Sequence, residues 1–337
     1  MIYMIELEMR LNDASAVLQT RPPYSAPIRR AFKKMSITYY QHKSRPILHC
    51  GSIISESNID SVQNRITNMP DTNPPQIDGC TLSYPAPFVL LLTINREKQM
   101  NSIPSQLHWQ MDAVFRWFDS EPSLRVAVIT GAGKKAFCAG QDLIEMGKAG
   151  VLKDHPSSGF AGISRRVGKK PIIAAVNGFA LGGGFEIVLN CDMVVAAPTA
   201  RFGLPEALRG IYAAAGGLPR LIRNVGLPIS SEIAMSGRQL SANEGLRYNL
   251  INSISKSQAT VVDEAVQLAT KVANISPDAI IVTRLALREA WETASVEKAY
   301  QISHDRFRQA LFAGENAKEG LKAFAEKRQP NWVPSKL

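Results

Sequence analysis

Two segments and two glutamates have the residue types and spacing that could carry chemistry. The segments are Phe137–Leu143 and Asn177–Glu186, and each follows an apolar run typical of a strand and precedes a predicted helix. Backbone N–H groups at the start of a helix favour a developing negative charge, and the glycines at 182–184 let a substrate approach them closely. The two segments therefore predict the two halves of a backbone oxyanion hole.

Glu186 and Glu206 are the candidate acid and base. Glu186 comes directly after the glycines, and Glu206 follows Pro205 at a second predicted helix start. Each glutamate alone would also fit an acid that complements a helix dipole, and a glycine-rich turn alone would fit a tight strand-to-helix connection. Beside an oxyanion hole, however, two carboxyl groups form an acid/base pair that can hold a water molecule. The dinucleotide-binding and P-loop patterns do not fit these glycines.

Composition narrows the class of protein. The chain has 337 residues, 45% hydrophobic and 20% charged, which is typical of a globular protein. The net charge of +10 comes from scattered basic residues without interleaved aromatics, so we predict no nucleic-acid partner and instead a solvated surface or a phosphate-bearing substrate. No apolar run approaches ~20 residues, so we predict no membrane span. The four cysteines and five histidines lack the spacing of a disulfide framework or a metal site.

Alternating strand and helix patterns predict an α/β fold. Four apolar runs are typical of strands: Phe88–Ile94, Val126–Thr130, Pro171–Val176 and Met193–Ala197. Gln106–Phe118 has helical spacing, and further helices are expected to start near Ser158 and Gly182. After Asn274 only helices are predicted, namely Ile280–Ala290, Val296–Phe312 and Ala317–Lys327, and we expect this end of the chain to serve assembly.

The domain prediction has four parts. Residues 1–80 are weakly periodic and rich in turns, so we expect a disordered or loosely packed extension. Its acids, Glu6, Glu8 and Asp13, argue against a transit peptide, and Met69 could be the true start of the chain. Residues 81–275 are predicted to form the core with the site, residues 276–334 a helical region, and residues 335–337 a targeting tripeptide.

Four stretches resemble the crotonase superfamily, specifically the enoyl-CoA hydratases and isomerases. They are Asn95–Asn101, Ala136–Leu143, Pro171–Asp192 and Phe202–Gly210, and Lys322–Arg328 resembles the family's C-terminal helix. The resemblance covers the chain from Pro87 to Trp332. It implies a crotonase-like spiral of ββα units with a C-terminal helical oligomerisation region that packs homotrimers, often stacked as hexamers. It also implies an acyl-CoA thioester as the substrate, with no cofactor and no metal.

The resemblance assigns roles to individual residues. It implies that the N–H groups of Ala139 and Gly183 bind the thioester carbonyl oxygen, which is worth ~3 kcal/mol per donor in such sites. Glu206 would deliver a proton to Cα, and Glu186 would activate the attacking water. The implied substrate-binding residues are Arg96, Lys98, Ala139, Gly140, Gln141, Asp142, Leu143, Gly182, Gly183 and Tyr212. Of these, Arg96 or Lys98 would contact the CoA phosphates.

One stretch departs from the family pattern. Many hydratases carry Pro-Gly-Ala-Gly-Gly after the position of Gly210, whereas this chain has Ile211–Gly217. Tyr212 and Arg209 add bulk or polarity there, and Phe185 could narrow the pocket beside the catalytic acid. We therefore expect the departure to change the preference for the acyl chain more than the chemistry.

The chain ends Ser335-Lys336-Leu337, which at a C-terminus is a peroxisomal import signal read by a receptor. The alternative is a chance tail. Because peroxisomes handle acyl-CoA thioesters, we prefer the signal and expect an accessible tail and a peroxisomal, eukaryotic protein.

These features predict a peroxisomal enoyl-CoA hydratase or isomerase, in fatty-acid β-oxidation or in the biosynthesis of a fatty-acid-derived secondary metabolite. The chain resembles fungal members of the family, including hydratase-isomerases of toxin pathways. The alternatives are another crotonase reaction, such as dienoyl-CoA isomerisation or thioester hydrolysis, and a non-catalytic CoA-binding subunit. The presence of both Glu186 and Glu206 argues against the last of these.

Overall fold

The computed structural model describes residues 69–149, 154–293 and 295–337. The N-terminal extension was predicted over residues 1–80, and its residues 1–68 therefore lie outside the described residues. Its last part is held against the core, because the Asp71 and Thr72 N–H groups donate to the Glu121 carboxylate at 3.0 and 2.9 Å. The indole Nε1 of Trp117 also donates to Thr72 Oγ1 at 2.7 Å. The loosely packed extension predicted to reach residue 80 does not extend into this stretch.

The first sheet contains the four strands that the sequence predicts. Its order is β1(Cys80–Ala86), β2(Val89–Ile94), β3(Val126–Gly131), β5(Ile172–Val176), β7(Met193–Ala196) and β10(Ser253–Ile254). β1 runs antiparallel to β2, and the other neighbours are parallel. The inner strands β3 and β5 are buried along their whole length, which explains their almost entirely apolar sequences.

The second sheet is built from strands of two or three residues. Its order is β4(Ala136–Cys138), β6(Phe179–Leu181), β8(Arg201–Gly203) and β9(Leu240–Ser241). Three times in succession the chain adds one strand to the first sheet, one to the second, and then a helical turn. These repeats are β3, β4 and α5(Leu143–Ala149); β5, β6 and α6(Gly183–Asn190); and β7, β8 and η3(Glu206–Arg209). The predicted spiral of ββα units is therefore confirmed.

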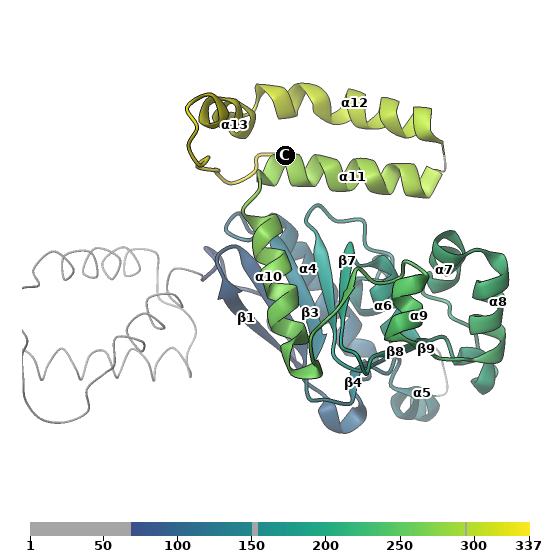
Figure 1. The fold of residues 1–337 in the computed structure, drawn as a ribbon. Helices are drawn as coiled ribbons and strands as arrows, with labels where there is room; N and C mark the ends of the chain where they lie inside the picture. Colours follow the sequence, from purple (N-terminus) through teal and green to yellow (C-terminus); the bar gives the residue numbers. More distant parts are fainter. Residues whose placement is uncertain (1–68, 150–153, 294) are drawn as a thin grey trace, which may run out of the picture. The chain divides into compact units, whose positions relative to one another are not determined.

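Helices cover both faces of the first sheet (Figure 1). α4(Ser105–Ser120) confirms the predicted helix and buries its apolar side with Leu107, Met111 and Phe118. α10(Val261–Ala273) lies on the other face, where the small residues Ala265, Ala269 and Ala273 allow close packing against the strands. The remaining core elements are η1(Glu97–Gln99), α7(Gly217–Val225), α8(Leu227–Ser236), α9(Ala242–Arg247) and η4(Gln258–Thr260).

The prediction of a helix that starts near Ser158 is wrong. The chain instead forms a single turn, η2(Phe160–Gly162), in which Ala161 has the left-handed values φ 56° and ψ 23°. Gly159 and Gly162 on either side also have positive φ, and this backbone cannot continue as a right-handed helix.

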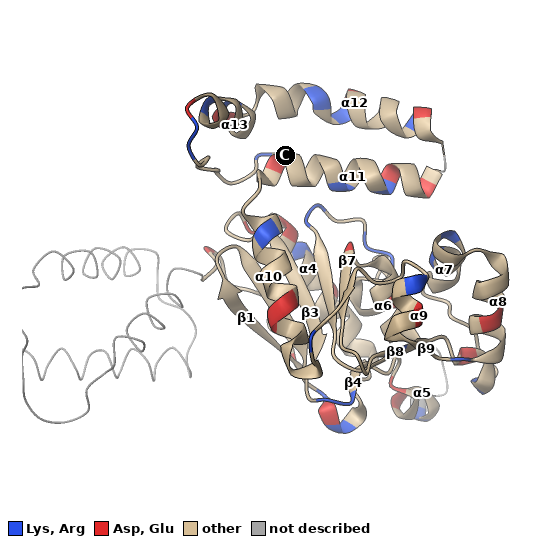
Figure 2. Cartoon of the chain, in the orientation of Figure 1, with Lys and Arg blue, Asp and Glu red and all other residues tan. Residues whose placement is uncertain are grey.

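The C-terminal region has the three predicted helices, grouped together in Figure 1. They are α11(Pro277–Thr293), α12(Val296–Ala313) and α13(Glu315–Ala325). They carry exposed apolar side chains, including Leu287, Tyr300, Phe312, Leu321 and Phe324. Figure 2 shows that basic and acidic positions are interspersed along the elements. In the described part of the chain, no helix is long and apolar enough to span a membrane.

Candidate active site

The turn between β6 and α6 holds the three glycines. Gly182 has φ 56° and ψ −128°, and a Cβ there would lie 3.1 Å from Glu206 Oε1, so only glycine fits. Its N–H donates to Gly203 O at 2.9 Å. The next N–H, that of Gly183, belongs to the first turn of α6 and has no acceptor among the described residues. One half of the predicted oxyanion hole is therefore an unpaired donor.

The prediction that Ala139 supplies the other donor is wrong. Its N–H donates to Met100 O at 3.1 Å and is not available to a substrate. The Gln141 N–H takes its place. Gly140 O accepts from Ile103 N and Asp142 N donates to Ile103 O, so both face Ile103 in a parallel bridge. The Gln141 N–H between them points to the opposite side, and no acceptor for it exists in the described parts of the chain.

Gly140 brings the two unpaired donors together. It has φ 92°, and a Cβ on it would lie 3.0 Å from Leu181 O and 3.2 Å from Gly183 N. The backbone that leads into Gln141 therefore touches the backbone that leads into Gly183. Two N–H groups on adjacent, closely packed turns are the arrangement that a developing oxyanion requires.

Glu186 is positioned by α6 and is only 3% exposed. Its Oε1 accepts from the Gly217 N–H at 2.8 Å, at the start of α7. Burial raises the pKa of this carboxyl, although the Gly217 and Ala215 N–H groups and Arg220 oppose the shift. Glu186 is thus held in one orientation by the backbone of the next helix.

Glu206 begins η3, directly after Pro205. Its Oε1 lies against Gly182, and its Oε2 is buried without a hydrogen-bond partner in the residues that the structure describes. Burial raises the pKa of Glu206 to about 7, and the charge of Glu186 adds to the shift. The structure therefore brings the two predicted acids together, and Glu206 can hold or release a proton near neutral pH.

Arg96 and Asp142 form an ion pair within the protein. Arg96 Nη2 lies 2.8 Å from Asp142 Oδ2, and Arg96 Nε donates to Ser102 O at 2.9 Å. Asp142 Oδ1 also accepts from the Glu145 N–H at the start of α5, at 3.2 Å. Both residues hold the turn that contains Gln141. A CoA-phosphate contact stays a prediction for the exposed Lys98, whereas the guanidinium of Arg96 is already engaged.

Leu143 and Tyr212, two of the predicted substrate-binding residues, are exposed. Leu143 begins α5 and is 44% exposed. Tyr212 is 71% exposed in the loop between η3 and α7, and its contact with substrate stays a prediction. The described residues include no group of three or more His, Cys, Asp or Glu side chains placed to bind a metal. The absence of a cofactor likewise stays a prediction.

His108 and Phe160 are site neighbours that the sequence reasoning missed. His108 is 1% exposed on α4 and hydrogen-bonds the Gln141 side chain, with Nε2 2.9 Å from Oε1. Phe160 lies 4.5 Å from the His108 ring, and its own ring lies against Gly183. The sequence did hold one signal, because His108 follows Leu107 on the buried side of a predicted helix.

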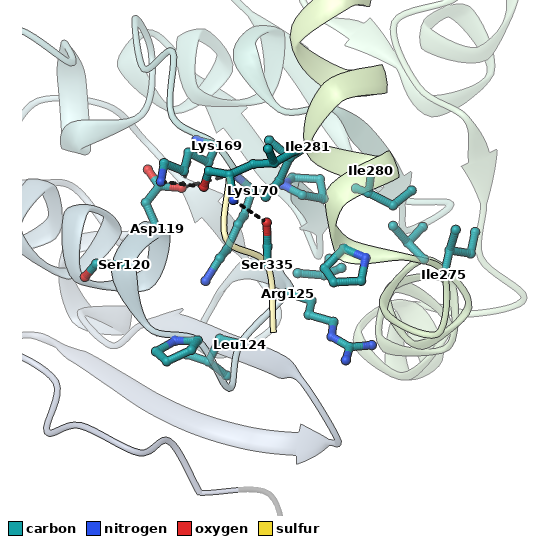
Figure 3. Close-up of a pocket in the computed structure, with 16 residues that line it drawn as sticks. Asp119, Ser120, Leu124, Arg125, Lys169, Lys170, Ile275, Ile280, Ile281 and Ser335 are labelled. Atoms are coloured by element: carbon teal, nitrogen blue, oxygen red, sulfur yellow. Dashed lines mark hydrogen bonds between the residues drawn. The ribbon is translucent and has the colours of Figure 1, made fainter. Parts of the chain in front are cut away.

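The C-terminal tripeptide is bound both to the core and to the C-terminal helices. The Ser335 hydroxyl donates to Asp278, Leu337 O accepts from Lys169 Nζ at 2.9 Å, and Lys336 pairs with Glu315. Ser335 and Leu337 line a cavity of about 240 Å³ with Lys170 and Arg125 (Figure 3). The tail, predicted to be accessible, is thus exposed mainly at Lys336. Neither catalytic candidate lines this cavity.

Comparison with known proteins agrees with this geometry. A sequence model of the family described as enoyl-CoA hydratase/isomerase matches residues 87–335. The chain belongs to this family. It is therefore an enzyme of the hydratase/isomerase class, and the crotonase resemblance is confirmed.

Several relatives are similar over nearly their whole length. The mevalonyl-coenzyme A hydratase of Aspergillus fumigatus is 47% identical over 78% of this chain and 98% of that protein. That of Beauveria bassiana is 49% identical with the same two coverages. The carnitinyl-CoA dehydratase of Proteus mirabilis is 39% identical over 72% of this chain and 94% of its own length.

Solved structures share the fold. An enoyl-CoA hydratase from Mycobacterium tuberculosis has a TM-score of 0.70 and 32% identity over 76% of this chain and 99% of its own. A probable enoyl-CoA hydratase/isomerase from Mycobacterium abscessus has a TM-score of 0.69 and 37% identity over 77% of this chain and 100% of its own.

Proposed function

We propose that the protein catalyses the reversible addition of water to a 2-enoyl-CoA thioester. The observation that carries the proposal is a pair of carboxyl groups with raised pKa, the buried Glu186 and the half-buried Glu206, beside the unpaired N–H groups of Gln141 and Gly183. Glu206, with an unpartnered buried oxygen among the described residues, is the proton donor to Cα. The names of the relatives, which are CoA hydratases and dehydratases, support the reaction class.

The mechanism follows from the positions of these groups. The thioester carbonyl oxygen accepts hydrogen bonds from the Gln141 and Gly183 N–H groups. The Glu186 carboxylate removes a proton from water as the water oxygen bonds to Cβ, and the electron pair of the double bond moves onto the carbonyl oxygen. Glu206 then protonates Cα as the enolate collapses, which gives the 3-hydroxyacyl thioester. Proton exchange restores the carboxyl pair, and dehydration is the reverse.

We propose a short, branched and hydroxylated acyl group as the substrate. The mevalonyl group named for the two fungal relatives has a hydroxyl on the carbon β to the thioester and a second hydroxyl at its far end. Loss of the β hydroxyl as water, and the reverse addition of water, are the two directions of the reaction described above. The departure at Ile211–Gly217, close to Glu206 and Glu186, supports an acyl preference unlike that of many hydratases.

Isomerisation of the double bond is a second candidate. Glu206 alone, with one buried oxygen unpartnered in the described structure, can carry a proton from one carbon to another. In that case Glu186 would only affect the charge near Glu206 and would transfer no proton.

The cellular setting is proposed from the end of the chain. Ser335-Lys336-Leu337 supports peroxisomal import through a receptor. The exposed apolar residues of α11, α12 and α13 support a homotrimer or hexamer, and no cofactor is required by the proposed chemistry.

Absorbance of the conjugated thioester tests the reaction. Purified protein should remove the absorption band of a short 2-enoyl-CoA, and Glu186→Gln or Glu206→Gln should each slow this by about 10²–10⁴-fold. Glu297→Gln, on the exposed side of α12, is the matched control and should retain activity. Formation of the band from a 3-enoyl-CoA, without its removal from a 2-enoyl-CoA, would replace hydration by isomerisation. Unchanged turnover in both site variants would refute the assignment.

A further inference from the structure

Hydrogen bonds fix the orientation of the Gln141 side-chain amide. The Ala161 N–H donates to His108 Nδ1 at 3.0 Å, so that nitrogen has no proton and Nε2 must have one. The Nε2–H then donates to Gln141 at 2.9 Å, and the acceptor must be the amide oxygen Oε1. The Gln141 NH₂ group is therefore turned away from His108.

The surroundings of His108 keep this arrangement over a wide pH range. The ring is buried between the rings of His155 and Phe160, whose centroids lie 4.6 and 4.5 Å away. Burial lowers the pKa of His108 to about 4; the neighbouring His155 also lowers it, whereas Glu145 and the Gln141 bond oppose the shift. His108 thus stays neutral above pH 5, and its single N–H continues to hold the Gln141 oxygen.

The Gln141 NH₂ group is an accessible hydrogen-bond donor beside the proposed oxyanion donors. Gln141 is half-buried, and its amide nitrogen is neither hydrogen-bonded nor among the buried unpartnered atoms of the described residues, so it is accessible. Its own backbone N–H is one of the two proposed oxyanion donors. Phe160, packed on His108, also lies against Gly183, which carries the other donor. The amide therefore stands beside the place where the thioester carbonyl would be bound.

We infer that the His108-oriented amide of Gln141 is a specificity determinant that donates a hydrogen bond to a hydroxyl at the far end of the acyl group. The inference rests on the proposed function, because that function places the thioester at the Gln141 and Gly183 N–H groups. A hydrocarbon acyl group would cover the amide without pairing it, and an unpaired polar group carries a penalty that discriminates between substrates. The site therefore selects a hydroxylated acyl group.

Two thioesters that differ by one hydroxyl test the inference. The probes are 5-hydroxy-3-methylpent-2-enoyl-CoA and 3-methylpent-2-enoyl-CoA, and the variant is Gln141→Met, which keeps the backbone N–H and the side-chain length. Wild-type protein should prefer the hydroxylated probe by about 10–100-fold in kcat/KM. The variant should lose this preference, because KM should rise more for the hydroxylated probe than for the plain probe. An unchanged preference, or an equal loss with both probes, overturns the inference.

His108 is tested as the positioning residue. His108→Phe should remove the same preference as Gln141→Met, and the double variant should lose no more than either single one, because both act through one amide. His108→Gln, which can still donate to the amide oxygen, should restore part of it. His155→Phe is the matched control, since His155 contacts the His108 ring without bonding Gln141, and it should keep the preference. Additive losses in the double variant would contradict a positioning role.

Binding separates this inference from the proposed reaction. If wild-type protein turns over neither probe, the proposed function fails. Calorimetry with the saturated thioesters, 5-hydroxy-3-methylpentanoyl-CoA and 3-methylpentanoyl-CoA, then decides the inference alone. Tighter binding of the hydroxylated thioester that Gln141→Met abolishes supports it, and equal binding of the two overturns it.

Discussion

At the scale of single residues, the proton held between Glu186 and Glu206 sets the pH range of activity. Hydration needs Glu186 ionised and Glu206 protonated, and dehydration needs the reverse, so both directions require one proton on the pair. Because burial raises the pKa of Glu206 to about 7, the pair loses that proton above neutral pH. We expect a bell-shaped profile of kcat/KM with its alkaline side near pH 7. Glu206→Gln should lose that alkaline side along with most of the rate, and a profile that stays flat from pH 6 to pH 9 would contradict the assignment.

The same residues show what sequence can predict at this scale. Glu186 and Glu206 could be predicted because each stands in a local sequence motif. The structure places the two carboxyl groups close enough for their charges to interact. The prediction of Ala139 as a donor was wrong because the direction of a backbone N–H depends on the segment that it pairs with. Here that segment contains Met100 and Ile103, which lie far from Ala139 in the sequence. The His108–Gln141 bond likewise joins residues from separate elements, and no spacing rule connects them.

At the scale of elements, the turn from β6 into α6 should tolerate no side chain at Gly182. Gly182→Ala places a Cβ 3.1 Å from Glu206 Oε1, in a backbone conformation with φ 56° and ψ −128°. We expect a loss of about 1–3 kcal/mol in the free energy of unfolding and a fall in kcat of at least about tenfold, because both Glu206 and the Gly183 N–H are displaced. Denaturant unfolding and steady-state kinetics measure the two effects.

Gly147 supplies the matched control for this turn. It lies in α5, and a Cβ there meets nothing within 4 Å. Gly147→Ala should therefore be neutral or stabilising by up to about 1 kcal/mol. Equal effects of the two alanines would show that Gly182 has no special role.

The elements also mark where prediction from sequence ended. β2, β3, β5 and β7 were predictable because buried parallel strands have continuous apolar sequences. The second sheet was missed, since strands of two or three residues have no periodicity to detect. The turn at Phe160–Gly162 was mistaken for a helix start because its left-handed Ala161 is set by packing against α4 rather than by residue type.

At the scale of the whole molecule, Asp192 joins α11 to the core. Its Oδ1 accepts from Arg284 Nε and Arg288 Nη2, each at 2.9 Å, and its Oδ2 accepts from the Ile172 N–H. The two arginines hold the pKa of Asp192 below its usual value against the effect of burial. Arg284→Met leaves a buried carboxylate with less compensation and should cost about 3–5 kcal/mol of stability. Arg328→Met removes a solvent-exposed pair with Glu319, which water screens, so it should cost much less stability than Arg284→Met. Similar losses of stability in the two variants, measured by denaturant unfolding, would contradict the argument.

The end of the chain connects the fold to the proposed import. Ser335 and Leu337 are half-buried and bound by Asp278 of α11 and Lys169 of the core, so a receptor that reads the tripeptide must compete with these contacts. A fluorescent protein fused to the N-terminus of the full chain should accumulate in peroxisomes, and deletion of Leu337 should leave it diffuse. Lys169→Met removes the contact with Leu337 O and should strengthen receptor binding severalfold, whereas Lys271→Met should not. Diffuse fluorescence of the intact chain would make the tripeptide a chance tail, and equal affinities of the two lysine variants would mean that the core does not restrain it.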